Sequence, residues 1–265
     1  WQTFFRASSS VNHASAKGSA SSCAPSSNWP GSLKSRVRRF CSAARNAVFF
    51  NRGPAGFVLD TAHPLAAVPD VTAALWGDYD NDGRTDVYLC RDGANQLWRQ
   101  TAKGQWSNVT AAAHADGGGG TTIDGALFDA DHDGDLDVLL IKRDGGDELL
   151  NNNGDGTFRS LGSKVGLADP RPSTGIVVAD LDENGDWEIV TAQGGGYLNV
   201  LDHVGNVVWT RQPTRDAELR SLAVYDLDGD GDLEILVAST QSANQWYVYE
   251  HDGTLRAGHW PQHYP

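Results

Sequence analysis

The stretch from Asp226 to Glu234 reads DLDGDGDLE and places aspartates at alternate positions before a glycine. The same pattern, D-x-D-x-[DN]-G-x-x-[DE], occurs three more times, as DYDNDGRTD at 78–86, DADHDGDLD at 129–137 and DLDENGDWE at 180–188. Carboxylates about 5 Å apart repel each other by about 3 kcal/mol per pair at an effective dielectric constant of ~20. Each loop is therefore expected to bind a cation, and its all-oxygen ligand set favours calcium.

The role of each ligand follows from its position in the loop. Positions 1, 3 and 5 supply side-chain oxygens, the glycine at position 6 lets the backbone turn sharply, position 7 offers its carbonyl and position 9 closes the site with a carboxylate. About four structural calcium ions are expected, and the third site should be the weakest because its position 5 is a neutral amide. The predicted metal ligands are Asp78, Asp80, Asp82, Arg84, Asp86, Asp129, Asp131, Asp133, Asp135, Asp137, Asp180, Asp182, Asn184, Asp186, Glu188, Asp226, Asp228, Asp230, Asp232 and Glu234.

The loops do not fit an EF-hand. An EF-hand loop begins in the same way but needs a glutamate at position 12, between two helices. Position 12 is occupied here by Leu89, Leu140, Thr191 and Val237. The runs before the loops (AALWG, GALF, GIVVA, LAVY) and after them (VYLC, VLLI, IVTA, ILVA) are short, apolar and rich in β-branched residues, so they predict buried strands on both sides.

The spacing of the loops indicates a repeat protein. Their first aspartates, Asp78, Asp129, Asp180 and Asp226, follow one another at intervals of 51, 51 and 46 residues. After each loop come two further strand-like segments separated by a turn, for example ELLNNN and TFRSL around NGDG. Four strands in about fifty residues fit one blade of a β-propeller, and a β-solenoid usually has shorter repeats.

The four loops and their flanking strands resemble the FG-GAP/VCBS-type repeats of calcium-binding β-propellers, over residues 71–265. Such repeats occur in integrin α-subunit heads and in many secreted or surface-anchored bacterial proteins, and LLNNNGDGTFRSLGSKVGL is most similar to the bacterial type. The resemblance implies that the loops join consecutive strands at one rim of the propeller, where calcium stiffens each hairpin. The predicted fold is an all-β propeller with about five four-stranded blades, either a small closed disc or part of a larger propeller.

The predicted domains differ in charge. Residues 1–59 contain eight of the 21 basic residues and none of the 34 acidic ones, and 1–45 are predicted to be a Ser-rich leader or a degenerate first blade. NAVFFNRGPAGFVLDTA, starting at Asn46, aligns with the segment that starts at Asn95 and so predicts an outer half-blade. The predicted repeats are a partial one at about 46–70 and complete ones at 71–122, 123–173, 174–219 and 220–265.

Composition narrows the function classes. The net charge is −13, and 15 of the 34 acidic side chains are predicted calcium ligands, so the acidity reflects ion sites and argues against a nucleic-acid surface on the repeats. No run of eighteen apolar residues predicts a membrane span. The chain has neither a methionine nor a signal peptide, so we expect a mature product or a fragment of a larger chain.

The motifs favour a binding module over an enzyme. A catalytic carboxylate pair need occur only once, whereas these acids recur at ligand spacing, and the sequence contains no nucleophile elbow, HExxH or phosphate loop. The predicted function is a protein- or glycan-binding scaffold that is extracellular, on the cell surface or periplasmic, because such calcium sites suit millimolar calcium. The alternative is an accessory or catalytic propeller domain of a secreted polysaccharide-degrading enzyme. Cys90 is expected to be a buried small hydrophobe, and Trp76, Trp98, Trp209 and Trp246 to pack between blades.

Overall fold

The computed structural model describes residues 46–144, 146–162, 167, 169–215, 217–240, 244–258 and 260–263. The predicted leader or degenerate blade at 1–45, which contains Cys23 and Cys41, lies outside these residues. The chain divides into two compact units between Val71 and Thr72.

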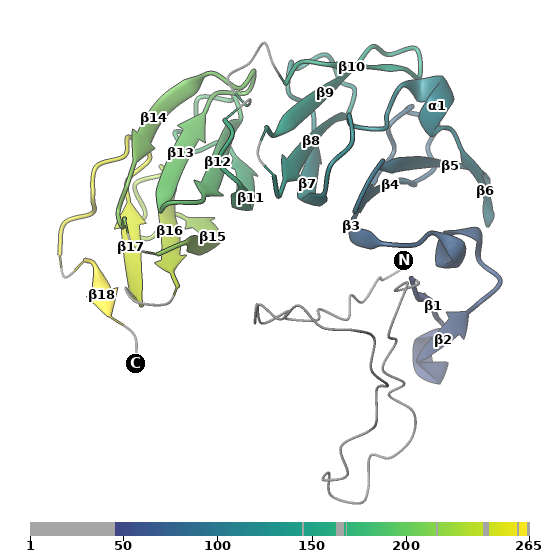
Figure 1. Cartoon of the computed structure of the whole chain (residues 1–265), viewed down its shortest axis with the longest axis horizontal. Coiled ribbons are helices and arrows are strands. Elements are labelled where there is room, and N and C mark those ends of the chain that lie inside the picture. Colours follow the sequence, from purple (N-terminus) through teal and green to yellow (C-terminus); the bar gives the residue numbers. More distant parts are fainter. Residues whose placement is uncertain are drawn as a thin grey trace, which may run out of the picture. The chain divides into compact units, whose positions relative to one another are not determined.

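The second unit contains four four-stranded sheets, and in each sheet the strands lie side by side in chain order (Figure 1). The first sheet consists of β3 (Val71–Gly77), β4 (Asp86–Arg91), β5 (Gln96–Ala102) and β6 (Gln105–Asn108). The second consists of β7 (Thr122–Phe128), β8 (Asp137–Lys142), β9 (Glu148–Asn152) and β10 (Phe158–Ser160). The third consists of β11 (Ser173–Ala179), β12 (Glu188–Gln193), β13 (Tyr197–Leu201) and β14 (Val207–Arg211). The fourth consists of β15 (Leu219–Tyr225), β16 (Glu234–Ser239), β17 (Gln245–Tyr249) and β18 (Gln262–His263).

The second strands of the second and third sheets are apolar on both faces because a neighbouring sheet covers each face. Side chains alternate between the two faces of a strand. In β8, Val138 and Leu140 belong to a core shared with the first sheet, whereas Leu139 and Ile141 belong to a core shared with the third. All four side chains are fully buried, and each contributes about 2 kcal/mol through the hydrophobic effect. The continuous run VLLI therefore identifies a strand between two stacked sheets.

The third and fourth sheets share a further apolar core. It includes Val190 and Val200 from the third sheet and Val237 from the fourth. Trp209 also lies in this core, where it packs against Tyr249 with ring centroids 6.3 Å apart. Successive sheets thus pack face to face, as the blades of a propeller do.

The described residues of the first unit, from residue 46 onward, contain one two-stranded antiparallel sheet, formed by β1 (Val48–Asn51) and β2 (Phe57–Asp60), with Val48 opposite Asp60. A short 3-10 helix, η1 (Gly53–Ala55), lies in the hairpin, and a second, η2 (Pro64–Ala67), follows it. This two-stranded sheet lies where the sequence predicts an outer half-blade.

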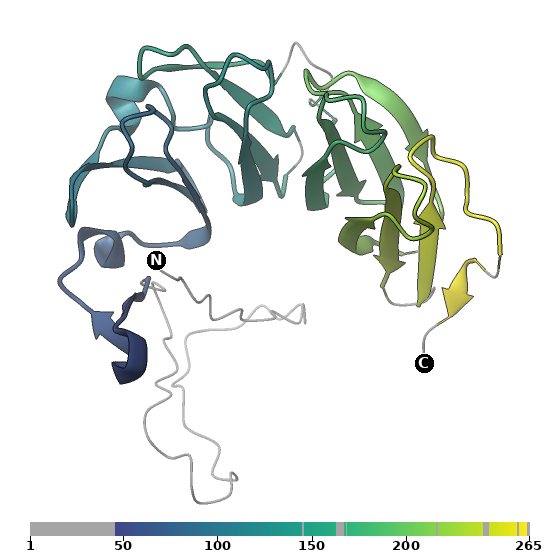
Figure 2. The same ribbon diagram turned by 180° about the vertical axis from the view of Figure 1, so that it is seen from behind.

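The predicted fold class is confirmed. The described residues contain one α-helix, α1 (Thr110–Ala113), which is a single turn, and the strands can be followed from behind in Figure 2. No helix in the described ranges is long and apolar enough to cross a membrane. Cys90 is a buried free cysteine, as expected. The prediction for Trp246 is wrong, since its side chain on β17 is 43% exposed.

Candidate metal centres

Each acidic loop connects the first two strands of one four-stranded sheet. Position 1 follows the first strand directly, and position 9 is the first residue of the second strand. Position 9 lies opposite the last residue of the first strand, as Asp137 lies opposite Phe128 and Glu188 opposite Ala179. The hairpin therefore brings the first and last predicted ligands together at the same end of every sheet.

The glycine at position 6 turns the backbone, as predicted. Its φ is 81°, 92°, 96° and 106° in the four loops in chain order, a left-handed conformation that L side chains rarely adopt. This turn aims backbone N–H groups at the first carboxylate. Gly83 donates to Oδ2 of Asp78 at 2.7 Å, and the same bond recurs at 3.0 Å in the second and third loops. In these three loops, the backbone therefore curls around the carboxylate at position 1.

The carboxylate at position 9 accepts hydrogen bonds from backbone N–H groups. Asp137 accepts hydrogen bonds from Ala130 N at 2.8 Å and from Asn152 N at 2.7 Å. In the third and fourth loops, Glu188 accepts from Leu181 N at 2.9 Å and Glu234 accepts from position 2 of its own loop at 2.6 Å. Position 9 is nearly or fully buried in the first, second and fourth loops. It is therefore a rigid inner ligand position.

Three carboxylates converge in every loop. In each group, one oxygen from each residue lies within 4.8 Å of the others. The first three loops use positions 1, 3 and 9, and the fourth uses positions 1, 3 and 5. The groups are Asp78, Asp80 and Asp86; Asp129, Asp131 and Asp137; Asp180, Asp182 and Glu188; and Asp226, Asp228 and Asp230.

Buried oxygens in these groups lack hydrogen-bond partners, which tests whether the residues fit a metal ion. Oδ1 of Asp80, Oδ2 of Asp86 and Oδ1 of Asp180 are buried and accept no hydrogen bond within the described structure. A buried carboxylate oxygen without a partner is costly, and native structures usually satisfy it with a donor or an ion. These oxygens belong to converging carboxylates, so the residues fit a hard divalent cation.

In the first three loops, the carboxylate at position 9 has a raised pKa. Burial raises the pKa of Asp86 to about 6, and the nearby charge of Asp80 adds to this effect. Burial likewise raises the pKa of Asp137 to about 6, with a further increase from Asp131. The pKa of Glu188 is raised for the same reason. Desolvation and like-charge repulsion both penalise the ionised forms, and a bound cation would relieve this penalty.

Position 5 belongs to the converging group in the fourth loop only, and no side chain at position 7 belongs to such a group. Asp82 and Asp133 are not in the converging groups, and Oδ1 of each accepts a hydrogen bond from the backbone N–H at position 7, as Oδ1 of Asn184 does. The side chains at position 7 contact residues other than the converging carboxylates. Arg84 pairs with Asp82, Asp135 accepts from Asn81, Asp186 lies 3.3 Å from His132, and Asp232 lies 3.1 Å from His251. Whether the position 7 carbonyls are ligands stays a prediction.

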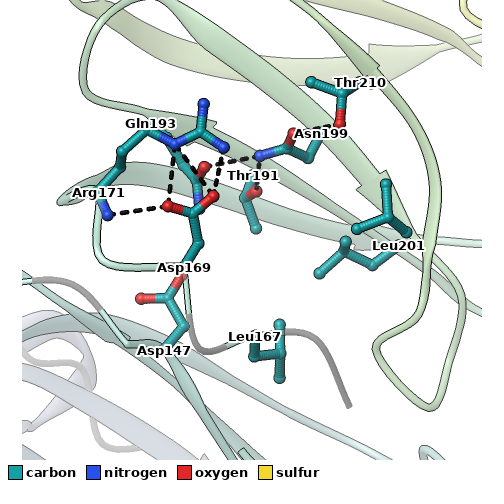
Figure 3. Close-up of a pocket in the computed structure, with 10 residues that line it drawn as sticks. Asp147, Leu167, Asp169, Arg171, Thr191, Gln193, Asn199, Leu201 and Thr210 are labelled. Carbon is teal, nitrogen blue, oxygen red and sulfur yellow. Dashed lines mark hydrogen bonds and ion pairs between the residues drawn. The ribbon is translucent and has the colours of Figure 1, made fainter. Parts of the chain in front are cut away.

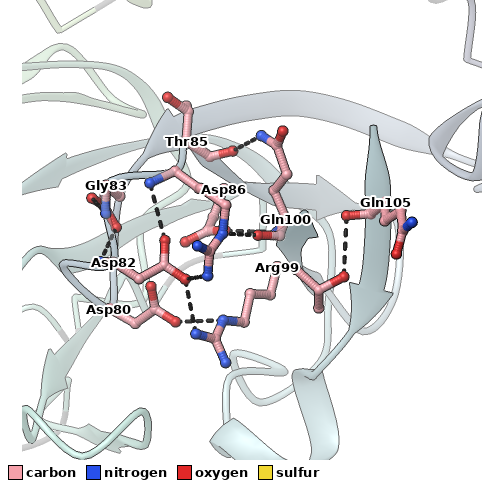
Figure 4. Close-up of polar contacts among 11 residues, drawn as sticks. Asp80, Asp82, Gly83, Thr85, Asp86, Arg99, Gln100 and Gln105 are labelled. Atoms are coloured by element: carbon pink, nitrogen blue, oxygen red, sulfur yellow. Dashed lines mark hydrogen bonds and ion pairs between the residues drawn. The ribbon is translucent and has the colours of Figure 1, made fainter. Parts of the chain in front are cut away.

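Sequence analysis missed residues that reach the loops from elsewhere in the same sheet. On β5, Arg99 pairs with Asp80 and Asp82 (Figure 4). On β9, Asn151 donates to Asp131 at 2.9 Å and to Asp137 at 3.1 Å. Both residues lie across from position 9 in the strand register, since Trp98 pairs with Val87 and Leu150 with Val138. Aligning the second and third strands of each repeat would have indicated them.

A small polar cavity lies between the second and third sheets, away from the loops. Its volume is about 60 Å³, which is room for a few water molecules. Arg171 pairs with Asp169 at its edge (Figure 3). The guanidinium of Arg171 also stacks on Tyr197, with the guanidinium carbon 3.7 Å from the ring centroid. Asp147, also in its lining, accepts from Ser173 Oγ at 2.6 Å, and burial raises its pKa to about 6. No pattern in the sequence predicts this cavity.

Two solved structures are similar to this chain, and the first of them supports the fold. The crystal structure of BBS1N in complex with ARL6DN has a TM-score of 0.50 and is 12% identical, and the alignment covers 74% of this chain and 58% of that one. An Agrocybe aegerita lectin that recognises non-reducing terminal N-acetylglucosamine has a TM-score of 0.46 at 17% identity, over 79% of this chain and 59% of the lectin. At such identities the likeness concerns the fold alone.

Sequence comparison identifies the repeats. Cartilage acidic protein 1 of Homo sapiens is 27% identical over 124 residues, which is 42% of this chain and 19% of that protein. The chain thus spans about a fifth of the length of this relative. A family model described as an FG-GAP-like repeat matches residues 78–140, 129–191 and 202–263, and these matches contain all four acidic loops. The chain belongs to the FG-GAP-like repeat family.

Proposed function

We propose that this chain is a calcium-stabilised β-propeller module that acts outside the cytoplasm as a binding or scaffold domain for a protein or glycan ligand. The converging carboxylates of the four loops would hold one calcium ion each, with further oxygens from positions 5 and 7. Bound calcium would supply positive charge between carboxylates that otherwise repel one another.

The observation that carries this proposal is the set of unpartnered, buried carboxylate oxygens. Asp86 is 1% exposed, its Oδ2 accepts no hydrogen bond, and one of its carboxylate oxygens lies within 4.8 Å of oxygens from two further aspartates. Surface acids without an ion turn toward water, and this one does not. A site for a hard cation accounts for both its burial and its missing partner.

The place of the sites in the fold supports a structural role for the ion. Position 1 ends one strand and position 9 begins the next, so an ion that contacts both would clamp the hairpin. An ion that binds only the folded state stabilises that state by mass action. Loops of this type are loaded where calcium is millimolar, which supports a location outside the cytoplasm.

A calcium count tests the proposal. Native mass spectrometry of the protein, before and after chelation, is expected to show about four bound calcium ions. Two or fewer would contradict one site per loop. A glycan array and a pull-down from extracellular proteins, each run with calcium and with chelator, would test the binding role, and calcium-dependent capture is expected in one of them.

The enzyme alternative has its own test. Incubation with pectic and other acidic polysaccharides is expected to give no cleavage. Turnover that persists at saturating calcium but disappears in Glu188→Gln would support catalysis by a loop carboxylate, and would overturn the binding-module proposal.

A further inference from the structure

Arginine side chains reach the acidic loops of the first and fourth sheets. In the first sheet, Nε of Arg99 lies 2.5 Å from Oδ2 of Asp80, and its Nη2 donates to Oδ2 of Asp82 at 2.8 Å. The arginine thus neutralises positions 3 and 5 of the loop. The unpartnered oxygens of Asp80 and Asp86 are not among its partners, so the arginine approaches the loop without filling the site.

The fourth loop has a closer arrangement. Nη2 of Arg256 lies 2.9 Å from Oδ2 of Asp228, and its Nη1 lies 3.1 Å from Oε1 of Glu234 and 3.2 Å from Oε2 of Glu250. Since Leu227 N donates to the other oxygen of Glu234, both oxygens of this buried position 9 are engaged. This explains why the converging group of the fourth loop uses position 5 in place of position 9.

Among the described residues, the second and third loops have no such cation. In the described part of the chain, no ion pair joins an arginine or lysine to their converging carboxylates, and Arg171 pairs with Asp169 near the cavity instead. The residue of the second sheet that corresponds to Arg99 is Asn151, which donates neutral hydrogen bonds to Asp131 and Asp137. The four loops therefore have similar sequences but different electrostatic surroundings.

We propose that Arg99 and Arg256 are internal counter-cations that lower the calcium affinity of the first and fourth loops, so that the second loop, which has four ligand carboxylates and no arginine partner among the described residues, binds calcium first. The inference rests on the proposed calcium function. A guanidinium beside a ligand carboxylate repels the incoming ion and, in the fourth loop, must release the position 9 carboxylate before that group can bind. The same arginines stabilise the calcium-free loops, because they offset repulsion between carboxylates.

This role predicts opposite effects in the two states of the protein. Arg99→Gln and Arg256→Gln should each tighten one class of calcium sites about tenfold in calorimetric titration, as expected for the loss of one nearby charge. Each should also lower the melting temperature in chelator. Arg99→Lys, which keeps the charge, should titrate like the wild type, and so should Arg220→Gln, because Arg220 on β15 pairs with Glu218 and not with a loop. A Gln variant with unchanged or weakened calcium binding would overturn the proposal.

The order of filling can also be measured in the unaltered chain. Substoichiometric Mn²⁺ broadens the NMR signals of nearby amides, so we expect Gly134, at position 6 of the second loop, to broaden before Gly185 of the third loop and before Gly83 and Gly231. If Gly83 or Gly231 broadens first, the hierarchy is wrong although the loops bind cations. If none of the four broadens, the calcium proposal itself fails.

Discussion

Nδ2 of Asn81 donates a hydrogen bond of 2.6 Å to Oδ1 of Asp135, so position 4 of the first loop contacts position 7 of the second. The contact recurs one sheet further on, where Nε2 of His132 lies 3.3 Å from Oδ1 of Asp186. Asn81 and His132 both have φ values in the left-handed region, which turns their side chains out of their own loops. Neighbouring loops are therefore linked directly, in addition to the apolar cores between the sheets.

The link between Asn81 and Asp135 should contribute measurably to stability. A double-mutant cycle of Asn81→Gly and Asp135→Ala is expected to give a coupling energy of about 0.5–1 kcal/mol by chemical denaturation, a usual value for one exposed hydrogen bond. Glycine is chosen because it tolerates the φ of 54° at position 81. The control cycle pairs Asn81→Gly with Asp186→Ala and should be additive. Additivity in both cycles would show that the link does not stabilise the fold.

The strands and loops could be predicted from the sequence for local reasons. The acidic pattern determines where each hairpin turns, and the apolar runs beside it match strands that are buried on both faces, such as β8. The left-handed turn at Gly83 and at the equivalent glycines could be predicted because a sharp turn at position 6 favours glycine. Even the half-blade near β1 followed from an alignment of one repeat with another.

The surroundings of the loops could not be predicted in the same way. Arg99 and Arg256 reach carboxylates that lie 19 and 28 residues away, and their approach depends on strand register and on the lengths of the intervening turns. Trp246 is misjudged because an apolar residue in a strand pattern has two possible faces, and only packing decides which one is covered. The cavity beside Arg171 likewise depends on how two sheets meet.

Calcium removal should destabilise the protein through its loops. A site at a free calcium concentration 100 times its dissociation constant adds about 2.7 kcal/mol to the free energy of unfolding, so chelation is expected to lower the melting temperature and re-added calcium to restore it. Asp131→Ala, in the converging group of the second loop, should remove part of this calcium effect. Asp133→Ala should remove less, because its Oδ1 is bonded to the backbone of its own loop.

The matched control for these variants is Asp144→Ala. Asp144 is an exposed aspartate in the turn after β8, outside the loops, and the variant should keep the full calcium response. A melting curve of the wild type that does not move on chelation would show that the loops are not occupied structural sites.

The buried carboxyl of Asp147 should make stability depend on pH. Burial raises its pKa to about 6 in the folded state, so the stability it contributes is fully present below its unfolded pKa near 4 and is lost as the pH rises through 6. The amide introduced by Asp147→Asn cannot ionise, and the variant should gain on the order of 2 kcal/mol relative to the wild type between pH 4 and pH 7.5. Urea unfolding in chelator measures this difference. The loop carboxylates make the same pH-dependent contribution to stability in both proteins, so their contribution cancels in the difference. Asp144→Asn should show no such gain, and a flat difference for Asp147→Asn would contradict the raised pKa of Asp147 in the folded state.

The third loop offers a test of ligation at position 5. Oδ1 of Asn184 accepts a hydrogen bond from Asp186 N at 2.7 Å, and an aspartate at this position can keep that bond while it adds one negative charge. Asn184→Asp should therefore tighten calcium binding at this loop, with a titration midpoint about tenfold lower. Trp187 is 37% exposed within the loop, so its fluorescence reports on binding there.

The control variant is Gln212→Glu, which adds the same charge at the opposite end of the same sheet, where Gln212 donates to Gly195 O. This variant should leave the midpoint unchanged. Equal shifts in both variants would indicate a general charge effect, and no shift in Asn184→Asp would count against a ligand at position 5.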